Sequence, residues 1–157
     1  MIERIVSGGQ TGVDRAALDA ALELGMACGG WCPKGRRAED GRLASRYPLR
    51  ETTSASYPQR TGWNVRDSDG TLILARGELR GGSALTATFA RRGAKPCLVV
   101  DLARDASMGA VAEAVDWVRT NAVRVLNVAG PRESESPGIH AQAIAFVREL
   151  VHLDRGG

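Results

Sequence analysis

The chain has 157 residues, 43% of them hydrophobic and 25% charged, which is typical of one α/β domain with its own core. Its 21 basic and 18 acidic residues are spread without a basic run, which argues against nucleic-acid binding. No leader follows Met1, no apolar stretch reaches the ~18 residues of a membrane span, and three cysteines, an odd number, suit a reducing compartment. We therefore expect a soluble, cytoplasmic protein that binds neither nucleic acid nor membrane.

Five short apolar runs predict strands, at residues 2–6, 27–32, 71–75, 97–101 and 124–129. The runs TLILA, CLVVD and RVLNVA lack polar alternation, which indicates strands buried on both faces of a parallel sheet. Apolar residues at helical spacing predict helices between them, at 13–24, from a cap at Ser83 to Arg92, around 111–118 and from Ser136 onward. The alternation predicts a Rossmann-like, doubly wound, mainly parallel five-stranded sheet with helices on both faces.

Residues 33–70 have few apolar side chains, and only one short helix is expected there, near residues 57–65. A connection of this length inside a compact domain is usually functional, so we expect a lid or binding loop. The whole of residues 1–154 is predicted to form one domain, followed by a tail at 155–157.

Glycine with polar or basic residues follows four of the five predicted strands, in the segments SGGQTG, PKGRR, ARGELRGGS and AGPRES. The carboxyl ends of parallel strands meet at one edge of the sheet, where ligands bind in this architecture. SGGQTG has no lysine, and Gly8, Gly9 and Gly12 do not fit G-x-G-x-x-G, so neither common nucleotide loop is present. Free N–H groups and the dipole of the following helix still favour an anion there, by about 0.3–1 kcal/mol per exposed charge.

RGGSALT repeats this pattern at the start of a later helix. Gly81 and Gly82 permit close backbone approach, while Ser83 and Thr86 offer hydroxyl groups to an oxyanion. An ordinary serine-capped helix explains the same residues, and this alternative stays open.

Four segments together, SGGQTGVDRAAL, YPLRETTSASYPQRTGWNVRDSDGTLIL, GGSALT and NVAGPRES with SPGI, resemble the molybdenum-cofactor carrier family. This family is a branch of the Rossmann-like superfamily that includes the lysine-decarboxylase-like LOG phosphoribohydrolases, and the resemblance covers residues 2 to about 150. It implies a cytoplasmic carrier or storage protein for the molybdenum cofactor (molybdopterin), a pterin with a phosphate tail. It also implies a homo-oligomer, a dimer or tetramer, with molybdoenzymes as candidate acceptors of the cofactor.

The LOG hydrolases carry P-G-G-x-G-T-x-x-E, whose glutamate contributes to cleavage of the N-glycosidic bond. Here Gly81 and Gly82 match, but Arg80, Leu85 and Thr88 replace the proline, threonine and glutamate. The resemblance therefore implies binding rather than hydrolysis. A nucleotide or phosphoribosyl hydrolase using Asp14 or Glu133, or a nucleotide-sensing module, stays open as the alternative.

Asp14 lies in the first turn of the first helix, where an acidic residue can simply stabilise the helix N-terminus. The functional alternative is that its carboxylate accepts N–H bonds from a heterocycle, or orients Arg15 or Arg60. Arg132 follows the fifth strand and should point at the ligand. Lys34, Arg36 and Arg37 form either a phosphate clamp or a solvated loop.

Other polar and aromatic residues are assigned to structure or left open. Asp67 and Asp69 favour a turn over a metal pair, and Cys28 and Cys32 are expected to be buried thiols. His140 and His152 have no triad partners at a telling spacing. The aromatic residues that frame the long segment could stack on a flat ring or pack in the core; they are Trp31, Tyr47, Tyr57 and Trp63.

The sequence thus predicts a cofactor-binding site without catalytic or metal-ligating residues. Its predicted members are Gly8, Gly9, Gln10, Thr11, Gly12, Asp14, Lys34, Gly35, Arg60, Gly81, Gly82, Ser83, Thr86, Asn127, Gly130 and Arg132. Because glycine at position 9 would let a ligand approach, Gly9→Val is expected to abolish binding while leaving the fold intact.

Overall fold

The computed structural model describes residues 1–104 and 108–156. Within them, five parallel strands form one sheet, as predicted. Their spatial order is β2 (Ala27–Gly29), β1 (Arg4–Val6), β9 (Val125–Ala129), β7 (Gly70–Ala75) and β8 (Cys97–Asp101). Because β9 lies between β1 and β7, the loop that follows it emerges at the middle of the sheet edge.

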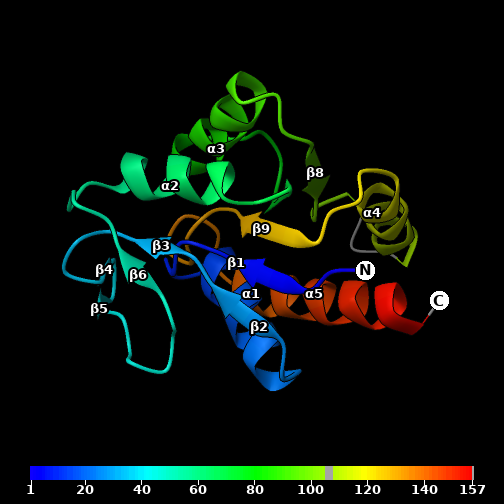
Figure 1. Ribbon diagram of the computed structural model, residues 1–157, viewed down its shortest axis with the longest axis horizontal. Helices are drawn as coiled ribbons and strands as arrows, with labels where there is room; N and C mark the ends of the chain where they lie inside the picture. The colour runs from blue at the N-terminus through cyan, green and yellow to red at the C-terminus, as the bar shows by residue number, and fades with distance from the viewer. Residues whose placement is uncertain (105–107, 157) are drawn as a thin grey trace.

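Helices cover both faces of this sheet (Figure 1). On one face α1 (Val13–Glu23) lies against α5 (Ile139–Gly156), and α4 (Met108–Thr120) packs on α5. On the other face α2 (Tyr57–Arg66) and α3 (Gly81–Arg92) pack against each other. No helix in the described part of the chain combines the length and apolarity needed to cross a membrane.

The main core fills the space between the sheet and α1, α4 and α5. All six residues of β7 are buried, which explains its uninterrupted apolar run. In α1 the buried positions are mostly alanines, including Ala16, Ala17, Ala20 and Ala21, whose small side chains let α5 approach closely.

The second predicted strand, 27–32, is broken at Gly30. β2 ends at Gly29 in the main sheet, and β3 (Trp31–Cys32) pairs instead with β6 (Arg50–Glu51). Gly30 has φ +120° and the side-chain amide of Asn64 bonds both backbone groups of Trp31, so the chain leaves the main sheet there.

The long segment after β3 contains more structure than predicted. α2 lies where a helix was expected, and a hairpin of β4 (Arg37–Ala38) and β5 (Gly41–Arg42) precedes it. Apolar side chains of the segment pack on Leu18 of α1 in a second small core, formed by Cys32, Ala38, Leu43, Tyr47 and Leu49.

Three predicted helix ends are wrong. Ser83 does not cap α3: it is the third residue of the helix, and Arg80 occupies the N-cap position in an extended conformation. α5 begins at Ile139, later than Ser136, because residues 133–138 form turns whose N–H groups are bonded by Glu133 and Arg132. α5 also continues to Gly156, so Arg155 and Gly156 are helical where a tail was expected, and Gly157 lies outside the described residues.

We predict that Gly30→Ala destabilises the fold by more than Gly25→Ala does. Both glycines have positive φ, which costs a residue with a side chain about 1–3 kcal/mol. A Cβ at Gly30 would also lie 2.5 Å from the Ser7 carbonyl oxygen, whereas a Cβ at Gly25 would meet no atom within 4 Å. Urea unfolding of the two variants measures the difference, and equal losses would contradict the assigned role of Gly30.

Candidate functional site

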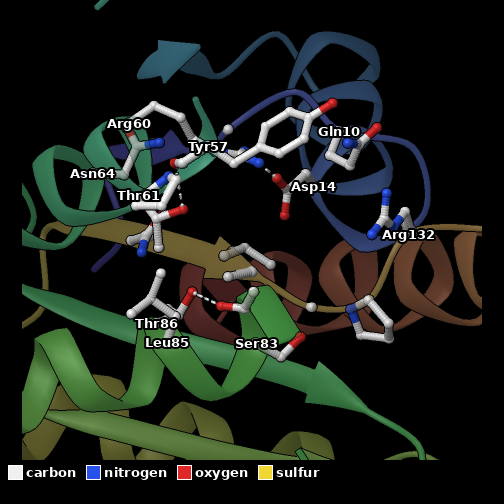
Figure 2. A pocket seen from close by; sticks show the side chains of 18 of the residues that line it. Gln10, Asp14, Tyr57, Arg60, Thr61, Asn64, Ser83, Leu85, Thr86 and Arg132 are labelled. Carbon is white, nitrogen blue, oxygen red and sulfur yellow. Dashed lines mark hydrogen bonds and ion pairs between the residues drawn. The ribbon is translucent and has the colours of Figure 1, made fainter. Parts of the chain in front are cut away.

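A cavity of about 290 Å³ lies at the carboxyl ends of β1, β9 and β7, between α2 and α3 (Figure 2). It lies at the edge of the sheet where the sequence places a ligand site. The residues that line it are Gly8, Gln10, Asp14, Tyr57, Pro58, Arg60, Thr61, Asn64, Gly82, Ser83, Leu85, Thr86, Asn127, Val128, Ala129, Gly130, Pro131, Arg132 and Glu135.

Ten of the sixteen predicted site residues line this cavity, and six do not. The ten come from four separate parts of the chain, which the fold brings together: Gly8, Gln10, Asp14, Arg60, Gly82, Ser83, Thr86, Asn127, Gly130 and Arg132. The six outside its lining are Gly9, Thr11, Gly12, Lys34, Gly35 and Gly81.

Nine lining residues are missing from the predicted set, and four of them, Tyr57, Pro58, Thr61 and Asn64, belong to α2. Tyr57, Arg60, Thr61 and Asn64 lie at positions i, i+3, i+4 and i+7, so they form one face of this helix, and that face lines the cavity. The spacing is visible in the sequence. These residues are mostly polar, whereas apolar residues at this spacing are the usual signal of a buried helix face.

Arg60 and Asp14 form a buried ion pair at one end of the cavity. Arg60 Nη1 donates to Asp14 Oδ2 at 3.0 Å, and the two side chains are 10% and 8% exposed. Burial raises the pKa of Asp14, while the positive charge and hydrogen bond of Arg60 partly offset this rise. Of the roles considered for Asp14, contact with Arg60 is therefore realised, and its other oxygen points into the cavity (Figure 2).

The glycines of SGGQTG are explained by protein atoms. A Cβ at Gly8 would collide with the guanidinium group of Arg60. A Cβ at Gly9 would lie 2.6–2.7 Å from methyl groups of Leu49 and Leu43, and one at Gly12 would strike the backbone around Pro131. This loop is glycine-rich because other parts of the chain pack directly on its backbone.

The expectation for Gly9→Val changes accordingly. Gly9 has φ +79° and lies under two leucines of the second core, outside the cavity lining. A valine there strains the backbone and displaces Leu43 and Leu49, so loss of function in this variant would reflect misfolding and would not locate the ligand.

The glycines at the start of α3 are different. A Cβ at Gly81 or Gly82 would meet no atom within 4 Å. Gly82 and Ser83 line the cavity. Thr86 Oγ1 donates a hydrogen bond to the carbonyl oxygen of Gly82, one turn earlier in α3. The open space beside these glycines lies at the positive end of the helix dipole, where an anion is favoured.

Arg132 follows β9 and lies at the side of the cavity near Gln10 (Figure 2). It forms ion pairs with Glu135 and, at 3.9 Å, with Glu39 on the turn between β4 and β5. Glu39 also accepts hydrogen bonds from Thr11 and Ser134. The β4–β5 hairpin is thereby tied to the loops that follow β1 and β9.

The basic residues 34–37 do not act together as a clamp. Arg36 turns inward and donates to four carbonyl oxygens, those of Leu43, Ala44, Tyr47 and Leu49. Lys34 is exposed, and the Arg37 guanidinium lies 5.2 Å from the ring centroid of Tyr57. Among these residues only Arg37 touches the wall of the cavity.

The remaining candidate residues have structural partners. Asp69 accepts from the backbone of Arg124 and Val125, and Asp67 accepts from Trp31 and Arg66, consistent with a turn. In the described residues, no three His, Cys, Asp or Glu side chains are grouped to hold a metal. Of the four framing aromatics only Tyr57 lines the cavity.

Glu133 and Thr88, the two other positions considered for catalysis, form hydrogen bonds within the protein. Glu133 accepts from the backbone N–H groups of Gly138 and His140 at the start of α5, and Thr88 Oγ1 bonds Ala84 within α3. Burial raises the pKa of the Cys32 thiol, which keeps it protonated and a weak nucleophile.

Comparison with known proteins agrees with this architecture. The model of the circularly permutated YpsA SLOG family matches residues 5–151. The chain belongs to this family. A crystal structure from Syntrophus aciditrophicus SB, described as a putative molybdenum carrier protein, is 46% identical over 98% of this chain and 94% of its own, with a TM-score of 0.91. No curated protein matches.

The family match and the structural match confirm the resemblance that the sequence motifs indicate. The structural match also confirms the predicted Rossmann-like fold. The ligand contacts of the sixteen predicted residues stay predictions.

We predict opposite effects of Gly8→Ala and Gly82→Ala on folding. Alanine at position 8 pushes Arg60 away from Asp14, and separating a buried pair costs about 3–5 kcal/mol. Alanine at Gly82 meets open space in the first turn of α3, and alanine is favoured over glycine in helices by up to about 1 kcal/mol. Urea unfolding measures both, and a stable Gly8→Ala variant would contradict the proposed packing of Arg60.

Acidification should weaken one of the contacts that hold the β4–β5 hairpin, the ion pair between Arg15 and Asp40. Arg15 donates to both oxygens of Asp40, at 2.5 and 3.0 Å, and this hydrogen bonding lowers the pKa of Asp40. A lowered carboxyl pKa adds stability at neutral pH that is lost as pH falls through the folded-state value, below about 4. Asp40→Asn should therefore be less stable than the wild type at neutral pH, by up to about 1 kcal/mol, and the difference should shrink as the pH is lowered below about 4. A difference that persists in acid would show that the charge is not responsible.

Proposed function

We propose that this SLOG protein binds a phosphorylated heterocycle in the cavity and carries or stores the molybdenum cofactor. One observation carries the proposal: the cavity has an open helix start at one wall and a buried carboxylate–guanidinium pair at another. The first suits a phosphate group, and the second suits the polar edge of a ring. A phosphorylated pterin presents both in one molecule.

The phosphate is assigned to the start of α3. Gly82 leaves space for an anion, the Ser83 hydroxyl is beside it, and Arg132 lies on the neighbouring loop. The start of α1 is less suitable because Asp14 occupies its first turn and the Val13 N–H donates to the Pro131 carbonyl oxygen at 3.3 Å. A second anion beside the Asp14 carboxylate would be repelled.

A carrier role is supported by the description of the 46% identical relative as a putative molybdenum carrier protein. The position of the LOG glutamate is Thr88, whose hydroxyl group is bonded within α3. The homo-oligomer and the molybdoenzyme acceptors are part of this proposal. Light scattering of the purified protein and transfer of bound cofactor to an apo-molybdoenzyme test these two parts.

Hydrolysis of a nucleotide is the second candidate, and Asp14 favours it. Asp14 lines the cavity and burial raises its pKa, as is common for acid–base residues. Glu133, the other carboxylate considered, bonds the start of α5 and does not line the cavity. Of the two carboxylates considered for hydrolysis, only Asp14 therefore lines the cavity.

The test is titration of the wild type and Gly82→Val with the molybdenum cofactor and with nucleoside 5′-monophosphates. Valine at position 82 enters space that no protein atom occupies, so it should fill the phosphate position and weaken binding by at least about 100-fold. The fold should persist, since Gly82 has no positive φ and no neighbour within 4 Å.

Ala84→Val is the matched control, because it adds the same kind of side chain to the first turn of α3 at a residue that does not line the cavity. It should bind like the wild type. Equal affinity in Gly82→Val would place the phosphate elsewhere. Release of free base by the wild type that is lost in Asp14→Asn would replace the carrier role with hydrolysis.

A further inference from the structure

The orientation of Asp14 determines which hydrogen bonds it can still accept. An ionised carboxylate has about four acceptor positions. Arg60 takes one of them on Oδ2, at 3.0 Å. The remaining capacity faces the cavity, where the second oxygen points (Figure 2). A ligand at this end therefore meets an acceptor that is already fixed and negatively charged.

The neighbouring groups offer little competition for this role. Asn64 uses its oxygen and its amide nitrogen on the backbone of Trp31. Thr61 Oγ1 donates to the Tyr57 carbonyl oxygen, and Thr86 Oγ1 donates to that of Gly82. Asp14 adds a carboxylate to these neutral groups, and a carboxylate is a stronger acceptor for the donors of a ring edge than a hydroxyl or amide group is.

The walls beside Asp14 suit a flat ring. Tyr57 of α2 and Leu85 of α3 lie on opposite sides of the cavity (Figure 2). The Arg60 guanidinium lies 5.3 Å from the centroid of the Tyr57 ring, so the ion pair also holds the aromatic wall in place. A planar heterocycle between these walls would present its edge to Asp14.

We propose that Asp14 selects a 2-amino-4-oxopyrimidine ring, the edge shared by pterins and guanine. This edge carries a ring N–H beside an amino group, two adjacent donors for one carboxylate. Hypoxanthine lacks the amino group, and adenine places a lone pair where the ring N–H would be, which repels the carboxylate. The cavity therefore accepts guanine nucleotides as well as pterins and rejects adenine nucleotides. This specificity rests on the proposed binding function and refines its ligand class.

Calorimetric titration of the purified full chain with the 5′-monophosphates of guanosine, inosine, adenosine and xanthosine tests the proposal. GMP should bind about 10-fold tighter than IMP and at least about 100-fold tighter than AMP, because a buried acceptor left without its donor is costly. GMP should also displace bound molybdenum cofactor. Similar affinities for AMP and GMP, or binding of the cofactor without binding of GMP, would overturn the proposal.

Asp14→Asn separates recognition from a structural role. An asparagine amide can donate to the 2-oxo group of xanthine and accept from its ring N–H, so XMP should gain affinity while GMP loses about 100-fold. A purely structural Asp14 would weaken all four ligands equally, and that result would refute the assignment.

Circular dichroism tests whether Asp14→Asn is folded. If the variant is unfolded, the affinities of the wild type for the four nucleotides alone decide whether the proposal holds. Arg46→Gln is the control, since Arg46 is exposed and does not line the cavity. It should leave the ranking unchanged. Failure of the cofactor and of all four nucleotides to bind the wild type would refute the binding function itself, a result distinct from loss of selectivity.

Discussion

The cavity depends on one buried ion pair, Asp14 with Arg60. Asp14 belongs to the loop and helix after β1, and Arg60 belongs to α2, forty-six residues later. Each charge needs the other because removing either leaves an uncompensated charge away from water. The pair therefore fixes α2 against the β1 loop, requires glycine at position 8 and holds Tyr57 in place. Without it, the polar face of α2 would have no fixed position beside the sheet.

The order of the strands supplies the rest of the site. β9 enters between β1 and β7, so Asn127 and the loop after it lie between the starts of α1 and α3. Those two helices cover opposite faces of the sheet, and the cavity lies at the carboxyl ends of the strands, at the point where the strand order reverses. Residues from four distant parts of the sequence thus share one space: three parts follow strands β1, β7 and β9, and the fourth is one face of α2.

Patterns of local origin were readable from the sequence, and contacts between distant segments were not. The strands, the helix at Tyr57–Arg66 and the edge of the sheet that carries the cavity follow from apolar runs and from glycine after strands. The position of Gly9 under Leu43 and Leu49 could not be predicted, because nothing near Gly9 indicates that the hairpin segment folds onto it. The break at Gly30 likewise depends on Asn64, which lies in another element. The polar face of α2 was readable in principle, since its spacing is helical.

The glycines after β1 have protein atoms packed against them, whereas the glycines at the start of α3 adjoin open space. At SGGQTG the protein itself occupies the space that glycine leaves, so this loop organises the carboxylate end of the cavity; at RGGS the space is open to a ligand. The two carboxylates in the lining are both paired, Asp14 with Arg60 and Glu135 with Arg132. A carboxylate held by a guanidinium group is a good hydrogen-bond acceptor but a poor proton shuttle, because taking up a proton breaks the pair. Fixed acceptors facing an open anion position favour recognition of a ligand over its cleavage.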